Sequence, residues 1–118
     1  MGTKTVSKEK LDLIIRRVKH YAKQYEFAIK NYKEDPDYAA IAIDRKEEFI
    51  KNLNELEKYT LPNEEIKKII QNVINADKFF LKHRKNYYKY VKRSSMWLDE
   101  DKEKLEKIIK EFIKKYIK

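Results

Sequence analysis

Apolar residues recur along most of the chain at steps of three and four, the spacing that places them on one face of an α-helix. Short breaks separate four such segments, so we expect helices over approximately residues 8–33, 36–58, 62–92 and 100–117. Connections of two to seven residues favour antiparallel neighbours. The pattern therefore predicts an all-α fold, a single-domain antiparallel four-helix bundle over residues 1–118.

The breaks between these segments carry residues that start helices. Pro36 and Pro62 are each placed to occupy a first helical position, where the missing N–H is no loss. We expect Asp99 to cap the fourth helix, because a short acidic side chain accepts an N–H of the first turn. Just before it, Trp97 and Leu98 are expected to form a lid over the end of the bundle.

Some positions depart from a plain apolar stripe. Lys46 falls inside the stripe of the second segment, so we expect its ammonium group to extend outward to water. In the third segment Ile74 lies off the stripe, whereas His83 and Tyr90 lie on it. A kink near residues 82–86 would fit this long segment.

Composition narrows the class of protein. At 118 residues the chain is long enough for one independent core. One glycine and two prolines argue against a hairpin-rich β fold, and the lack of cysteine excludes disulfides and thiolate chemistry. No apolar run approaches the roughly 20 residues of a membrane span. The N-terminal residues 1–7 lack a signal-peptide core, and Val6 stands where myristoylation requires Ser or Thr. We expect a soluble, cytoplasmic protein.

The net charge of +9 is concentrated in one stretch, Lys78 to Arg93, which holds seven basic residues, one histidine, five aromatics and no acid. On a helix five of its lysines share one side, and we call them the lysine row: Lys78, Lys82, Lys85, Lys89 and Lys92. The row would extend over about 21 Å at 1.5 Å per residue. Its length and sign suit a nucleic-acid phosphate backbone.

The sequence therefore predicts a small non-enzymatic protein that binds DNA or RNA without sequence preference, in an accessory or regulatory role. Arg84 and Arg93 would assist the lysine row, and Arg16, His20 and Lys23 of the first helix would add to it. The other interpretation of the row is a solvated face. Phe79, Leu81 and Tyr88 flank the row, and they are better candidates for stacking on bases than Phe80, Tyr87 and Tyr90, which fall on the core side. Binding to an anionic membrane surface would need an apolar face that the bundle already uses.

The face of the first helix opposite its apolar stripe carries a second indication of function. Leu13 and Phe27 lie there among basic residues, opposite the core stripe. Large apolar side chains on an outer face suggest a partner surface, although isolated exposed ones are common. A homodimer through this helix would be the simplest use. The alternative function is therefore a protein–protein adaptor, or a subunit of a larger assembly, with no direct role in nucleic-acid binding.

Catalytic chemistry finds little support. His20 and His83 stand in separate segments, without an HExxH or Glu-x-x-His pair. The acidic residues Asp44, Glu47 and Glu48 could ligate a hard cation but fit a solvated face better. A glycine-rich phosphate loop is impossible with a single glycine at position 2. We expect no catalytic residue, no metal, no cofactor and no small-molecule substrate.

Overall fold

The computed structural model describes residues 6–117 and contains four helices. Their bounds are Lys8–Lys30 (α1), Pro36–Glu57 (α2), Glu64–Val91 (α3) and Asp101–Tyr116 (α4). No strand occurs within residues 6–117. The predicted all-α class and the four predicted helices are thus confirmed. The expectation that the N-terminal residues contain no signal-peptide core concerns residues 1–5, which lie outside the described residues.

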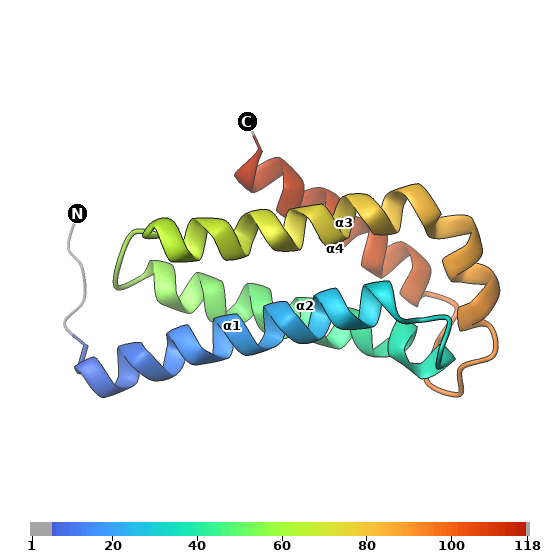
Figure 1. Cartoon of the computed structure of the whole chain (residues 1–118), viewed down its shortest axis with the longest axis horizontal. Helices are drawn as coiled ribbons and strands as arrows, with labels where there is room; N and C mark the ends of the chain where they lie inside the picture. Colours follow the sequence, from blue (N-terminus) through green and yellow to red (C-terminus); the bar gives the residue numbers. More distant parts are fainter. Residues whose placement is uncertain (1–5, 118) are drawn as a thin grey trace.

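Successive helices reverse direction, so that α1 and α3 run one way and α2 and α4 return (Figure 1). Both α1 and α4 pack against α2 and α3, whereas α1 and α4 make no contact with each other in the described part of the chain. The order around the bundle is therefore α1, α2, α4, α3, with α1 and α4 at opposite corners. The molecule is 46 Å long, close to the roughly 42 Å expected for the 28-residue α3.

Side-chain caps fix the starts of the first three helices. Ser7 Oγ accepts from the Lys10 N–H at 3.2 Å, Asp35 Oδ1 from Asp37 at 2.9 Å, and Asn63 Oδ1 from Ile66 at 2.9 Å. Each bond satisfies an N–H that has no partner within its helix. The prediction for Pro62 was therefore wrong, because this proline precedes the cap and lies outside the helix.

Two predicted helix ends also differ from the structure. The α1 helix ends at Lys30 because Asn31 closes its last turn: both its backbone N–H and its side-chain amide donate to the Phe27 carbonyl. At the start of α4, the predicted cap Asp99 does not serve, and Glu100 stands at the cap position without a side-chain bond. Asp101 Oδ2 instead accepts from the Leu98 N–H at 2.7 Å, which holds the preceding loop to the first turn.

Aromatic side chains form much of the core. Tyr25, Phe49, Phe80 and Tyr87 are fully buried, and the Tyr87 hydroxyl donates to the Ala39 carbonyl. Around them lie aliphatic residues from all four helices. These contacts tie α3 to α1 and α2 along the centre of the bundle.

The predicted lid is half right. Trp97 packs against Tyr87 and Tyr88, with ring centroids 6.3 and 6.2 Å apart. Leu98, in contrast, points into solvent and is 58% exposed. The lid is therefore the tryptophan ring alone.

The buried arc of α3 is wider than one stripe, because α3 packs against all three other helices. Ile74, predicted off the stripe, is buried for this reason. Tyr90 is half-buried, its ring 5.7 Å from that of Tyr32, and His83 lies half-buried against the Phe79 ring. The last turns of α3 bend (orange in Figure 1).

An ion pair lies inside the core, where Lys46 of α2 meets Asp77 of α3. Both side chains are 0% exposed. The Lys46 ammonium donates to the two Asp77 oxygens at 2.7 and 2.5 Å, and the Tyr25 hydroxyl donates to Asp77 Oδ1. The ammonium also lies 4.1 Å from the centre of the Phe112 ring. The prediction that Lys46 extends outward to water was wrong, because Asp77 provides a partner at the same level of the bundle.

Burial dominates the protonation of this pair. It lowers the pKa of Lys46 to about 8, although the Asp77 carboxylate opposes that change. It raises the pKa of Asp77, against the opposing effects of Lys46 and the Tyr25 hydroxyl. Burial raises the pKa of Tyr25 as well. Removing the two charges from water therefore outweighs their attraction to each other.

Candidate nucleic-acid interface

The lysine row lies on the outer surface of the C-terminal half of α3. All five of its side chains are exposed. None of them forms an ion pair with another residue of the described chain. Because α3 has no acidic residue after Asp77, no carboxylate of this helix stands between the lysines. Four of these lysines lie on α3 itself, and Lys92, the residue after the helix, borders a groove that Asp99 also lines.

Neighbouring side chains show which way the row points. On one flank of α3, Arg84 and Tyr88 turn toward Glu106 of α4, with Arg84 Nη1 3.4 Å from Glu106 Oε1. On the other flank, Asn72 lines a groove beside α1. By the helical repeat, the row falls between these two flanks, on the side away from the core. The row is therefore exposed to solvent on the outer side of the bundle.

Arg84 and Arg93 differ from the row in their surroundings. Arg84, predicted to assist in binding, already has a carboxylate partner in Glu106. The Arg93 guanidinium lies beside the Tyr90 ring, 5.7 Å from its centre. Both side chains are exposed, but Arg84 has an ion-pair partner, whereas the five lysines have none in the described chain.

The basic residues predicted on the first helix form a separate surface. Arg16, His20 and Lys23 are exposed on α1. His20 and Lys23 line a groove between α1 and α2, and Lys23 also reaches the edge of the groove beside α3. The lysine row stands on a different helix, α3. The structure thus divides the ten predicted nucleic-acid-binding residues into two groups.

Of the three stacking candidates, Phe79 is the one that remains accessible, with 37% of its surface exposed. Its ring lies 4.5 Å from the ring of His83. Leu81 is half-buried against the core, and the hydroxyl of Tyr88 donates to Glu106 Oε2 at 2.6 Å. Any contact with bases next to the row would therefore involve Phe79.

The two residues predicted at a partner interface are exposed as expected. Leu13 is 38% exposed and Phe27 is 52% exposed. The Phe27 ring packs edge-on against Tyr38 of α2, with 5.4 Å between centroids. This contact orients the ring at the mouth of the α1/α2 groove.

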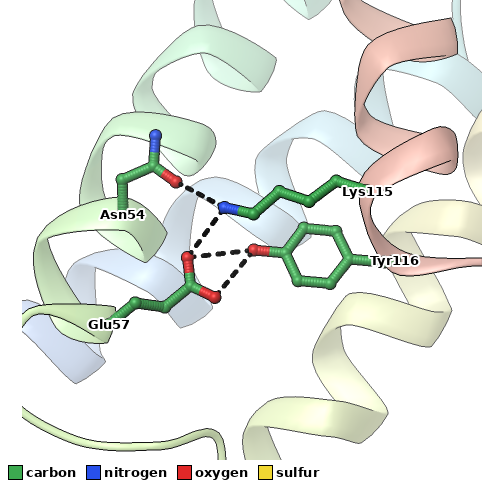
Figure 2. Close-up of polar contacts among 4 residues, drawn as sticks. All are labelled: Asn54, Glu57, Lys115 and Tyr116. Carbon is green, nitrogen blue, oxygen red and sulfur yellow. Dashed lines mark hydrogen bonds and ion pairs between the residues drawn. The ribbon is translucent and has the colours of Figure 1, made fainter. Parts of the chain in front are cut away.

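A polar cluster that the sequence did not indicate joins the ends of α2 and α4 (Figure 2). Glu57 Oε1 accepts from Lys115 Nζ at 3.0 Å and from the Tyr116 hydroxyl at 3.1 Å, and Asn54 Oδ1 accepts from Lys115 at 3.1 Å. The cluster borders a groove of about 530 Å³ floored by Leu53 and Phe112. Its polar groups bond to one another, so the cluster fastens α4 to α2.

Among residues 6–117, no three histidine or carboxylate side chains gather closely enough to hold a metal ion. Within the same range, none of the helices is at once long and apolar enough to cross a bilayer. The chain matches no known family model, no curated protein and no solved structure.

Proposed function

We propose that this chain binds nucleic acid through phosphate contacts of the lysine row, as a non-enzymatic accessory or regulatory protein. One observation carries the proposal: five exposed lysines on one side of α3 have no ion-pair partner in the described chain. Like charges aligned in this way repel one another in the free protein. A polyanion along the row would relieve that repulsion.

The dimensions of the row support a backbone ligand. Consecutive lysines are three or four residues apart, which is about 4.5–6 Å along the helix axis. Ammonium groups act as point charges, without the fixed fork that lets arginine read a guanine edge. Such contacts hold phosphates and carry little sequence information. We therefore expect binding with weak sequence preference.

The experiment compares two variants with the same net charge. Lys82→Glu/Lys85→Glu/Lys89→Glu reverses the centre of the lysine row. The control, Lys51→Glu/Lys68→Glu/Lys107→Glu, changes three exposed lysines on α2, α3 and α4 that have no ion pair in the described chain. Each variant lowers the net charge from +9 to +3.

Affinity for labelled single- and double-stranded oligonucleotides is measured by fluorescence anisotropy at about 50 mM salt, where phosphate contacts are strong. We expect the row variant to lose binding while the control keeps most of it, with the same helical circular dichroism in both. Equal losses in the two variants would mean that net charge alone attracts the nucleic acid. Unchanged binding in the row variant would make the lysine row a solvated face.

A further inference from the structure

A groove of about 560 Å³ lies between α1 and α2, away from the lysine row. The apolar residues of its lining are Phe27 and Ala28 of α1 and Tyr38 and Ile41 of α2. Half of the Phe27 surface faces solvent, although its ring is held in place against Tyr38. A fixed aromatic ring at the mouth of an apolar groove is typical of a site that receives a large apolar anchor.

The edges of this groove are basic. His20 and Lys23 stand on the α1 side, and Lys23 has no ion-pair partner in the described chain. Arg45 stands on the α2 side, where its Nε donates to Gln24 and its Nη1 pairs with Asp44. Among the described residues, the lining includes no acidic side chain. Because the Arg45 charge is already paired with Asp44, the charge that favours a partner with carboxylates is that of Lys23, which has no ion-pair partner in the described chain.

The exposed face of α1 extends the groove toward the N-terminal end. Leu13, His20 and Phe27 are seven residues apart and so fall nearly in line on the helix surface. From Leu13 to Phe27 the line is about 21 Å long at 1.5 Å per residue. Arg16 is exposed beside it. A partner of about four helical turns would match this length.

We propose that the α1/α2 groove binds an acidic amphipathic α-helix of a partner protein. A leucine or aromatic anchor of that helix would pack on Phe27 and Tyr38, and its carboxylates would face Lys23 and Arg16. A third helix lying along a furrow between two antiparallel helices is a common mode of peptide recognition.

Two other occupants fit less well. A second copy packed through α1 would bring Arg16 and Lys23 of one chain against the same residues of the other, and like charges oppose that contact. Nucleic acid would find an apolar floor beneath a few cations, whereas the lysine row offers five free ammonium groups.

The probe is a fluorescein-labelled 18-residue helical peptide with leucine or phenylalanine on one face and glutamate on the other. Two control peptides replace its anchors by alanine or its glutamates by lysine. We expect the parent peptide to bind, and Phe27→Ala and Lys23→Glu each to weaken it at least tenfold. Because both side chains are exposed, neither change should alter the circular dichroism. The row variant Lys82→Glu/Lys85→Glu/Lys89→Glu should bind the peptide as well as its charge-matched control does.

Several results would overturn the proposal. One is the absence of binding at about 100 µM protein, and another is equal affinity of Phe27→Ala and the unchanged protein. Equal binding of the alanine-anchor peptide would reduce the interaction to general charge attraction. Sedimentation that shows a dimer lost in Phe27→Asp would assign the groove to a second copy. Loss of oligonucleotide affinity in Phe27→Ala would assign it to nucleic acid.

Discussion

The buried pair of Lys46 and Asp77 permits a quantitative test of the core. We consider Asp77→Leu, Lys46→Met and the double variant Lys46→Met/Asp77→Leu. In the first, the Lys46 ammonium loses both carboxylate oxygens and keeps only aromatic faces, those of Tyr25 at 4.7 Å and Phe112 at 4.1 Å. An unpaired charge at a site that is 0% exposed strongly opposes folding.

The magnitude follows from the geometry. Two unit charges 4 Å apart attract by about 4 kcal/mol at an effective dielectric constant of about 20, and the Lys46 nitrogen lies closer than this to the Asp77 oxygens, at 2.7 and 2.5 Å, so their attraction is at least of this size. Breaking a buried pair on one side destabilises a protein by about 3–5 kcal/mol, a large share of the roughly 5–15 kcal/mol of a typical domain. We expect Asp77→Leu to lose stability of this size. Lys46→Met should lose a similar amount, because in either single variant the remaining partner must stay buried as an unpaired charge or become neutral, and burial shifts the pKa of both groups toward the neutral form.

The double variant should lose much less stability than the sum of the losses in the two single variants. Burial lowers the pKa of Lys46 to about 8 even with Asp77 beside it, so the cost of removing the charges from water offsets much of their attraction. Replacing both charges by apolar groups should therefore leave stability within about 2 kcal/mol of the original. The assay is urea unfolding followed by circular dichroism, with the exposed Lys51→Met as control on the same helix. The reasoning fails if the losses of the single variants simply add in the double variant.

Three further predictions follow from single contacts. Between pH 8 and about 10, the unfolded chain binds a proton at Lys46 that the folded chain releases. The stability of the protein relative to Lys46→Met/Asp77→Leu should therefore rise with pH, by at most about 1.4 kcal/mol per pH unit. Urea midpoints of both proteins at pH 7.5 and 9.5 test this, and the same stability difference at the two pH values would contradict it. Tyr87→Phe removes one of two hydrogen bonds to the Ala39 carbonyl, which keeps its bond within α2, and should lower the free energy of unfolding by about 0.5–1.5 kcal/mol. An unchanged free energy of unfolding would show that the Tyr87 bond contributes little. Glu57→Ala removes the contacts of Glu57 with Lys115 and Tyr116 in the last turn of α4, so backbone amide exchange in that turn should accelerate. The free energy of global unfolding should change by less than about 1 kcal/mol. Unchanged exchange would mean that apolar packing alone holds this turn.

Hydrophobic spacing was sufficient to predict the four helices, since each one buries a single continuous face. The same spacing could not predict contacts between residues of different helices. Lys46 and Asp77 both lie on core-facing positions of their helices, and the opposite charges at those positions were the signal that could have paired them. The pairing itself depends on the relative height of α2 and α3, which no single-helix pattern contains.

At the candidate interface, too, the sequence pattern predicts which residues share a helix face but not their contacts with other helices. The side of α3 that carries the lysine row could be predicted, because one helix determines which residues share a face. The fate of Arg84 could not, because its pairing with Glu106 depends on where α4 packs. Likewise, Phe27 could be predicted as exposed, but the groove beneath it exists only because α2 returns beside α1.

The salt dependence of oligonucleotide binding tests the central proposal most directly. If the five lysines of the row each neutralise one phosphate of a single strand, log K should fall with log salt with a slope of about −3.5. Affinity would then drop by about 100-fold between 50 and 200 mM salt. Changing one lysine of the row, as in Lys85→Gln, should reduce the slope by about 0.7, and Lys51→Gln should not. A slope near zero, or the same slope in both variants, would contradict phosphate binding by the lysine row.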